Sequence, residues 1–158
     1  MIGAMEKLIT LESDVFATGQ IEPADLAAIA RLGIRTIIDH RPDSEISPDL
    51  ASGEMARAAA QFGIAFLYQP VSGYELDQPE FAATLCRTLS VLPSPVLLYC
   101  RSGRRSTILW ALASQRRLGQ NTVLAVAERS GLPRQDVLPL LEAAQEMAIS
   151  PTPETTVS

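Results

Sequence analysis

The chain has 158 residues, of which 47% are hydrophobic and 20% are charged, so its size and composition fit one globular domain with its own core. Two cysteines are too few for a disulfide framework, and with a single histidine they give no metal-ligand spacing, so we expect no metal and no cofactor. The formal net charge of -5 gives no general attraction to nucleic acid or to an acidic membrane, so neither is an expected partner.

The chain also lacks the patterns of a membrane or secreted protein. Its apolar runs, such as residues 107–115, are far shorter than the roughly 20 residues that span a bilayer. The N-terminus has no basic segment followed by an apolar one, so it does not resemble a secretory signal. We therefore expect a cytoplasmic protein.

The first half of the chain alternates between short strands and helices. Apolar residues 15–18 predict a strand, and a proline and a glycine bound a helix over residues 24–32. The β-branched residues 34–39 predict a buried strand that ends in a polar loop at 40–45. A helix over 54–62 follows, with its predicted buried face formed by Met55, Ala59 and Phe62.

The second half continues this alternation. Residues 64–68 predict a strand, residues 79–92 a helix, and the wholly apolar residues 95–99 a strand from the middle of a parallel sheet. Three more helices are predicted over 105–118, 122–130 and 135–147.

This order predicts a single α/β domain over residues 1–149, with a central, mainly parallel sheet of four to five strands flanked by helices. Functional sites in such folds lie at the carboxyl ends of the strands. The tail, residues 150–158, is rich in Ser, Thr and Pro and cannot bury enough apolar surface to order itself, so we predict that it is disordered.

The segment that joins the last predicted strand to the following helix carries the candidate chemistry. It reads Cys100-Arg101-Ser102-Gly103-Arg104-Arg105-Ser106. Inward-pointing amides and a helix N-terminus hold an anion and favour a thiolate, which is the nucleophilic form of cysteine. Gly103 lets the backbone approach a ligand, and Arg105 supplies a bidentate clamp for a tetrahedral oxyanion. Ser106, directly after it, is expected to donate a hydrogen bond either to the cysteine sulfur or to a leaving thiolate.

The remaining residues of this loop are expected to bind the anion together with these. Arg101 and Arg104 complete a basic island in an acidic chain, and Ser102 adds a hydroxyl, which suggests a small anionic substrate. The competing interpretation makes Cys100 a buried core cysteine and the arginines a solvated helix start. It leaves unexplained why cations occupy the first turn of a helix, where they oppose its dipole. Cys86, on a predicted helix face, is interpreted as a core residue.

Several separated pieces of the sequence resemble the phosphatase-like domain of beta-lactamase hydrolase-like proteins, a family related to the dual-specificity phosphatases. The resemblance extends from about residue 9 to residue 146. The pieces that carry it are Ala17-Thr18-Gly19-Gln20, Gly33-Ile34-Arg35-Thr36-Ile37-Ile38, Arg41-Pro42-Asp43-Ser44-Glu45, Tyr68-Gln69-Pro70-Val71, the segment from Tyr99 to Ser106, and Leu109-Trp110.

The resemblance implies roles for individual residues. Cysteine phosphatases use a thiolate nucleophile, an arginine on the phosphoryl oxygens and an acid that protonates the leaving group. By position these are Cys100, Arg105 and Asp77, with Glu75 and Asp43 as competing candidates for the acid. The alternative for Asp77 is that it caps the helix that begins near residue 79.

Two departures from the usual phosphatase signature keep a second function open. Tyr99 stands where a histidine usually precedes the cysteine, and Arg105 arrives one residue early. The shorter loop also resembles that of single-domain rhodaneses, whose cysteine carries a persulfide and needs no general acid. The flanking sequence favours the phosphatase, with sulfur transfer second and a non-catalytic anion-binding module third.

The expected partner is a small anionic substrate, either a phosphate ester or a sulfur donor, or a phosphoprotein; the oligomeric state and the physiological substrate stay open. The loop after residue 39 also carries polar side chains. We interpret His40 as a hydrogen-bonded structural residue, with a place in the lining of the cleft as the alternative, and Arg41, Asp43 and Glu45 as an ion-paired wall with a scaffolding role.

Overall fold

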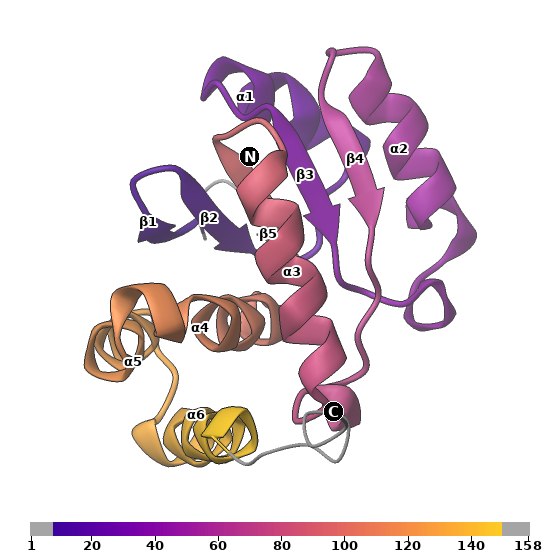
Figure 1. Cartoon of the computed structure of the whole chain (residues 1–158). Coiled ribbons are helices and arrows are strands. Elements are labelled where there is room, and N and C mark those ends of the chain that lie inside the picture. The colour runs from indigo at the N-terminus through magenta and orange to yellow at the C-terminus, as the bar shows by residue number, and fades with distance from the viewer. Residues whose placement is uncertain (1–7, 150–158) are drawn as a thin grey trace, which may run out of the picture.

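The computed structural model describes residues 8–149, which form a five-stranded sheet between two layers of helices (Figure 1). The sheet order is β1-β2-β5-β3-β4, with β1 antiparallel to β2 and every other pairing parallel. This confirms the predicted mainly parallel sheet. The strands are β1 (Ile9–Glu12), β2 (Val15–Thr18), β3 (Thr36–Asp39), β4 (Ala65–Tyr68) and β5 (Val96–Tyr99).

Helices cover both faces of the sheet. One face carries α1 (Leu26–Arg31) and α2 (Ser52–Ala60), and the other carries α3 (Pro79–Val91) and α4 (Arg104–Leu118). Two further helices, α5 (Gln120–Arg129) and α6 (Arg134–Ile149), pack against α4 on its outer side. Parallel strands require such crossover helices, which is why the predicted alternation leads to three layers.

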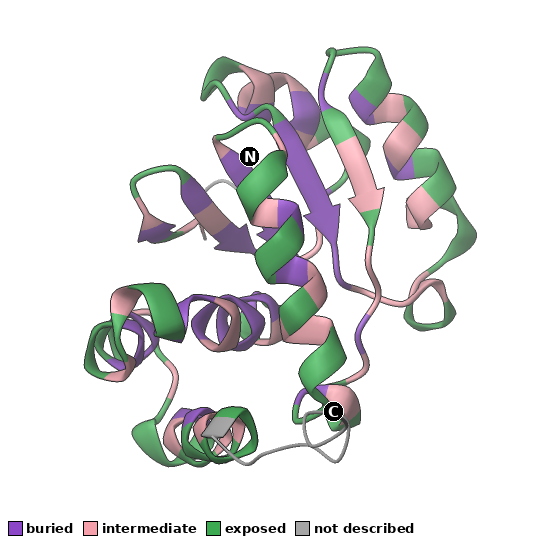
Figure 2. Ribbon diagram, in the orientation of Figure 1, coloured by how far each residue is buried: buried purple, intermediate pink, exposed green. Residues whose placement is uncertain are grey.

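Strand β5 occupies the centre of the sheet because its four residues are apolar enough to be buried on both faces. Leu97 and Tyr99 pack toward α1 and α2, whereas Val96 and Leu98 join the larger core with α3 and α4. Figure 2 shows β3 buried along its length, while the edge strand β4 is only half-buried or exposed. The central strand therefore delivers the following loop from the most rigid part of the fold.

The structure corrects several sequence-based expectations. Strand β1 was not predicted, because its four residues are too short and mixed to show a strand pattern. Phe62 was placed on the buried face of its helix, which is wrong: α2 ends at residue 60 and Phe62 is 45% exposed. Cys86 was interpreted as a core residue, which is also wrong, because the side chain lies on an exposed face of α3.

Helix α4 is tied to the edge of the sheet by a polar contact. The carboxylate of Glu12 in β1 accepts a hydrogen bond from Nε1 of the buried Trp110 at 2.7 Å. It also forms an ion pair with Arg117 at 2.8 Å. Burial opposes ionisation of Glu12, but these hydrogen bonds outweigh it and hold the pKa of the carboxyl below its usual value. The contact holds α4, which is the helix that follows the Cys100 loop, against the edge of the sheet.

Within residues 8–149, no helix combines the length and apolar character needed to cross a membrane. In the same range, no group of three His, Cys, Asp or Glu side chains lies close enough together to hold a metal ion. The predicted disordered tail, residues 150–158, falls outside the described residues, so that tail and the proposed domain limits of 1–149 stay predictions.

Candidate active site

The candidate loop begins directly after the central strand β5 and ends at the N-terminus of α4. Gly103 is the N-cap of this helix and has a φ of 93°, a left-handed conformation that side chains other than glycine rarely adopt. This conformation turns the Gly103 amide back toward the start of the loop, where it donates to Sγ of Cys100 at 3.1 Å. The loop thus places a backbone dipole on the sulfur.

The loop packs tightly against the end of β2. The Cys100 amide donates to Thr18 O at 3.3 Å, and the Gln20 amide donates to Arg101 O at 3.2 Å. A Cβ atom added at Gly19 would lie 2.9 Å from Arg101 O, which is closer than real side chains approach a backbone oxygen. Gly19 is therefore required for the loop to lie on this strand end, which explains why a glycine occupies that position.

Arg105 is held in place on two sides. Its Nη1 and Nη2 atoms donate to the two carboxylate oxygens of Glu45 at 3.0 and 2.8 Å, and Nη1 also donates to Val71 O at 2.8 Å. The side chain is only 13% exposed. A guanidinium fixed by a carboxylate and a carbonyl presents its donors in one orientation, as a bidentate oxyanion clamp requires.

Glu45 is itself supported by Arg41. The Arg41 guanidinium lies 3.6 Å from Glu45 Oε1 and also donates to Glu45 O and to Gln20 Oε1. The hydrogen bonds from Arg105 are the main cause that lowers the pKa of Glu45, so this carboxyl is ionised at neutral pH. The expected Arg41 and Glu45 ion pair is confirmed, whereas Asp43 accepts hydrogen bonds from Ser52 instead.

Sequence reasoning missed the part that Glu45 plays at Arg105. The two residues lie 60 positions apart, and no motif spacing connects them. Only the parallel order of β3 beside β5 brings the loop after β3 to the start of α4. The sequence does show that Glu45 is an acidic residue on a loop that follows a strand. That observation predicts a place near the carboxyl ends of the strands, but it does not predict that Glu45 contacts Arg105.

His40, which follows β3, contacts Ser106 at the end of the Cys100 loop. His40 is 1% exposed, Ser106 is 0% exposed, and Nδ1 of the imidazole lies 3.1 Å from Oγ of the serine. Burial, with the Arg105 cation as a smaller cause, lowers the pKa of His40 to about 3, so the ring is neutral at physiological pH. The expectation of a hydrogen-bonded structural histidine is confirmed.

A buried carboxyl and phenol flank the strand ends on the opposite face of the sheet. Asp39 and Tyr99 are register partners in β3 and β5, and both are buried. Burial raises the pKa of Asp39 to about 6, although its Oδ1 accepts the Arg41 amide at 2.8 Å. Burial and the Asp39 charge raise the pKa of Tyr99, so its hydroxyl keeps its proton. Tyr99 packs against Phe66 with ring centroids 6.3 Å apart.

The predicted binding residues differ in exposure. Cys100, Gly103 and Ser106 are buried, while Arg101, Ser102 and Arg104 are exposed. Arg104 forms an ion pair, because its guanidinium lies 3.7 Å from the carboxylate of Asp136 at the start of α6. Arg101 and Ser102 therefore form the outer rim of the loop, and the sulfur lies at its base.

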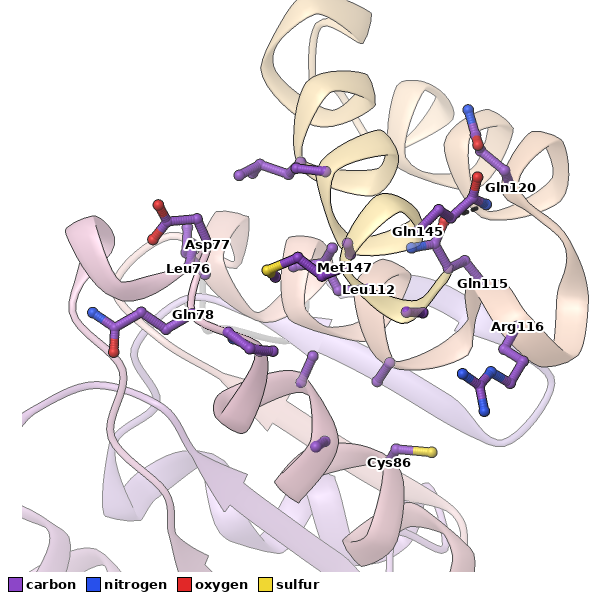
Figure 3. Close-up of a pocket in the computed structure, with 18 of the residues that line it drawn as sticks. Leu76, Asp77, Gln78, Cys86, Leu112, Gln115, Arg116, Gln120, Gln145 and Met147 are labelled. Atoms are coloured by element: carbon purple, nitrogen blue, oxygen red, sulfur yellow. Dashed lines mark hydrogen bonds between the residues drawn. The ribbon is translucent and has the colours of Figure 1, made fainter. Parts of the chain in front are cut away.

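The structure places the three candidates for the general acid in two separate hollows. Glu75 and Asp43 line an open hollow of about 420 Å³ beside the β3 and β4 loops. Asp77 is exposed and lines a larger cavity of about 690 Å³, between α3, α4 and α6 (Figure 3). No residue from 100 to 106 lines that cavity, whereas Cys86 does.

The contacts of the three carboxyls differ as well. Both oxygens of Asp43 accept from Ser52, and Oε1 of Glu75 accepts from the Ser72 amide. The helix-capping alternative for Asp77 is wrong, because Gln78 holds the N-cap position of α3. The role of Asp77 as general acid stays a prediction.

The sequence places this chain among known proteins. Residues 7–117 match the family described as the beta-lactamase hydrolase-like protein, phosphatase-like domain. The beta-lactamase hydrolase-like protein of Xylella fastidiosa strain Temecula1 is 31% identical over 108 residues, or 68% of this chain. The match covers 25% of the relative, so the chain spans about a quarter of the length of the curated relatives that it resembles.

Several solved structures share the architecture of this chain. A candidate phosphatase from Neisseria meningitidis Z2491 has a TM-score of 0.74 and 28% identity, covering 87% of this chain and 98% of its own. The P. aeruginosa protein TpbA, with cysteine replaced by serine and in complex with pTyr, has a TM-score of 0.63 and 14% identity, covering 95% of each chain. At this identity, the second likeness shows the fold alone.

Both the extent of the sequence match and the arrangement around Cys100 lead to one assignment. The matched residues include strands β1 to β5 and most of α4, and the solved neighbours have cysteine-phosphatase folds. The chain belongs to the family of the phosphatase-like domain of beta-lactamase hydrolase-like proteins.

Proposed function

We propose that the chain is a cysteine-dependent phosphatase that hydrolyses phosphate esters through a phosphocysteine intermediate at Cys100. The observation that carries the proposal is the Gly103 amide, which donates to Sγ of Cys100 at 3.1 Å. A donor aimed at sulfur stabilises the thiolate relative to the thiol, and the thiolate is the attacking species. The oriented guanidinium of Arg105, five residues after Cys100, supports the proposal because it can bind the oxygens of a phosphoryl group.

The proposed reaction has two steps. The Cys100 thiolate attacks phosphorus, so an S–P bond forms and the P–O bond to the leaving group breaks as an acid protonates the leaving oxygen. Water then attacks phosphorus and gives a proton to the conjugate base of that acid, the S–P bond breaks, and phosphate leaves. Arg105 holds two phosphoryl oxygens in both steps, and the loop amides with Ser102 and Ser106 bind the rest of the anion.

The burial of the nucleophile sets a condition on this reaction. Cys100 is 0% exposed, so a phosphoryl group reaches the sulfur only when part of the loop moves. The side chains of Arg101 and Ser102 are exposed, so these side chains can move without loss of packing, while the Arg101 carbonyl is held by the Gln20 amide. We therefore assign the entry of substrate to this rim, with Arg101 attracting the anion.

Asp77 is the first candidate for the general acid, because its place in the sequence before Cys100 matches that of the acid in cysteine phosphatases. An acid matters most for substrates whose leaving group is a poor one, such as an alkyl phosphate, and least for a nitrophenyl phosphate. Asp77→Asn should lower kcat on the alkyl ester more than on the nitrophenyl ester. Glu75→Gln and Asp43→Asn provide matched comparisons, and the variant with the larger selective loss identifies the acid.

The Arg105 clamp and one structural neighbour support a class of substrate for this proposal. A tetrahedral dianion suits Arg105 and the loop amides, and the TpbA complex with pTyr makes an aryl phosphate the first ester to test. We propose that a small phosphate ester or a phosphoprotein is the partner of this site. An aryl phosphate and a phosphotyrosine peptide compared on one preparation separate these two sources of the same group.

One experiment tests the activity. Purified protein should hydrolyse an aryl phosphate, vanadate should inhibit it, and Cys100→Ser should abolish turnover. Cys86→Ser, which changes the exposed cysteine of α3, is the matched control and should retain turnover. Hydrolysis that survives Cys100→Ser would contradict the proposal.

A sulfurtransferase is the second candidate, because four residues separate Cys100 from Arg105 instead of the five of the usual phosphatase signature. In that reaction, Cys100 takes a sulfur atom from thiosulfate, sulfite leaves, and cyanide then removes the sulfur as thiocyanate. Thiocyanate release without phosphate release would favour this function. Stabilisation by phosphate with neither activity would instead favour an anion-binding module.

A further inference from the structure

A cavity of about 690 Å³ lies between α3, α4 and α6 (Figure 3). Helices α3 and α6 each pack against α4, and the cavity is the space that remains between the three helices. No residue from 100 to 106 lines it. Its volume falls within the roughly 300–1,000 Å³ that is usual for pockets that bind small molecules. The cavity is therefore a candidate binding site that is separate from the proposed active site.

Most of the wall of this cavity is apolar. Leu112 of α4 and Leu140 and Met147 of α6 contribute large side chains, and alanines from all three helices complete the wall. Met147 is 45% exposed, so part of this apolar surface is in contact with water. A ligand with an apolar part that covers the wall would remove this surface from water, which favours binding.

The charged residues of the cavity lie at its two ends. Figure 3 shows Asp77 at one end and Arg116 at the opposite end. Arg116 is exposed, and it is the one cation among the described residues that line the cavity. Its neighbour Arg117 pairs with Glu12, whereas the side chain of Arg116 forms no ion pair or hydrogen bond with any described residue. A free guanidinium at the end of an apolar cavity is complementary to a carboxylate, which it can bind through two hydrogen bonds.

The polar side chains in the wall are unsuited to a peptide. Gln115 donates to Leu141 O at 3.2 Å, and Gln145 donates to Oε1 of Gln115 at 3.1 Å, so these two amides are already engaged. The backbone of a peptide would lose hydrogen bonds to water in this cavity without gaining enough partners, whereas an aliphatic chain has no polar group to satisfy. None of the described residues that line the cavity is aromatic, so the wall offers no surface on which a ring could stack.

We propose that the cavity between α3, α4 and α6 binds a long-chain carboxylate. The carboxylate group binds the guanidinium of Arg116, and the unbranched aliphatic chain packs against Leu112, Leu140 and Met147. Charge complementarity at Arg116 and the apolar wall beside it carry the inference. It is independent of the proposed function of Cys100, because the cavity contains no residue of the Cys100 loop.

A series of saturated carboxylates tests the apolar part of the site. Octanoate, decanoate and dodecanoate are titrated into the full chain by calorimetry, each below the concentration at which it forms micelles. One molecule should bind per chain, and each added methylene should tighten binding about two- to fourfold because it buries more apolar surface. Absence of binding by all three carboxylates, or an affinity that does not depend on chain length, would overturn the proposal.

The charge of the head group is tested on the same chain length. Dodecyltrimethylammonium carries a cation in place of the carboxylate and should bind at least about tenfold more weakly than dodecanoate. Arg116→Ala should weaken dodecanoate binding about three- to tenfold. Arg129→Ala, at an exposed position of α5 outside the cavity, is the matched control and should leave the affinity unchanged. Equal affinities for the two amphiphiles would show adsorption by the apolar chain alone and would overturn the proposal.

A substitution that fills the cavity locates the bound chain. Ala83 is an exposed residue of α3 that lines the cavity, so Ala83→Phe should fold normally and abolish dodecanoate binding. Ala125→Phe, at an exposed position of α5 outside the cavity, is the matched control and should bind as the parent protein does. Unchanged binding in Ala83→Phe would place the ligand elsewhere and contradict the proposal.

Cys86 provides a readout of occupancy that needs no activity. It is exposed, it lines the cavity, and in a Cys100→Ser background it is the one remaining thiol. With dodecanoate at about ten times its Kd, iodoacetamide should alkylate Cys86 about tenfold more slowly, because only the unoccupied fraction reacts. An unchanged rate would contradict the proposal.

The segment that follows α6 is the competing occupant within the chain itself. Residues 150–158 continue directly from α6, whose last turns line the cavity. The parent protein and a variant that ends at residue 149 should bind dodecanoate with similar affinity. Binding that appears only in the shortened variant would overturn the proposal and assign the cavity to that segment.

Discussion

Glu45 and Arg105, which are 60 residues apart in the chain, meet through two hydrogen bonds of 2.8 and 3.0 Å on the two terminal nitrogens of the guanidinium. A carboxylate can only accept from the guanidinium, so the effect of Glu45 is to orient the cation. Val71 O supplies the other fixed point. The guanidinium is thus held in one orientation by groups of the chain itself.

The first prediction concerns this pair. Glu45→Ala leaves Arg105 with Val71 O alone, so the guanidinium loses its fixed orientation and kcat/KM for an aryl phosphate should fall about tenfold or more. Steady-state kinetics measure the change. Glu54→Ala, which breaks a surface pair with Arg57 on α2, is the control and should leave kcat/KM within about twofold. Unchanged kinetics in Glu45→Ala would mean that Val71 O suffices.

The second prediction concerns the contact of Gly19 with the loop. In Gly19→Ala, the new Cβ would meet Arg101 O at 2.9 Å, so the loop has to shift and the protein should lose about 1–3 kcal/mol of unfolding free energy. Urea unfolding measures the loss, and activity should fall with it. Gly53→Ala, in α2 with no atom within 4 Å of the added Cβ, is the control and should gain up to about 1 kcal/mol.

The third prediction concerns acid stability. Because the folded-state pKa of Glu12 is lowered, its ionised form stabilises the fold above about pH 4, and this contribution disappears as the pH falls through the folded-state pKa. Glu12→Gln should lower the unfolding free energy by about 1–2 kcal/mol at pH 7 and reduce the loss of stability below pH 4. Glu142→Gln on the exposed side of α6 is the control; a parallel pH profile in both variants would refute the assignment.

Titration of Asp39 should change the unfolding free energy with pH in the opposite direction to titration of Glu12. Asp39 has a folded-state pKa of about 6, so the folded state holds a proton that the unfolded state has already lost between about pH 4 and 6. The unfolding free energy should therefore decrease as the pH rises through this range, by about 2–3 kcal/mol in all.

The corresponding variant isolates this group. Asp39→Asn keeps an oxygen for the Arg41 amide and removes the titration, so its stability should be nearly constant between pH 4 and 7. Asp49→Asn, on an exposed turn, should keep the slope of the parent protein. Urea unfolding at several pH values measures both, and a slope that persists in Asp39→Asn would assign the titration to another group.

Much of the fold and the centre of the site are predictable from local patterns. The apolar residues of β5 predicted a central strand, and Gly103 predicted a tight loop before α4, because strand burial and loop curvature depend on neighbours in the sequence. By contrast, the sequence pattern predicted that Phe62 and Cys86 are buried, and both are exposed. Whether a residue on a helix face is buried depends on where the helix ends and on what packs against it.

The sequence by itself determined the alternation of strands and helices, the central place of the Cys100 strand and the turn at Gly103 that follows it, because these depend on contacts between near neighbours. Only the tertiary structure decided that Glu45 holds Arg105, that His40 meets Ser106 and that Asp77 lies in a different hollow from Glu75. Those relationships join segments brought together by the order of the parallel strands. No local pattern encodes the distance between two loops that share only an edge of the sheet.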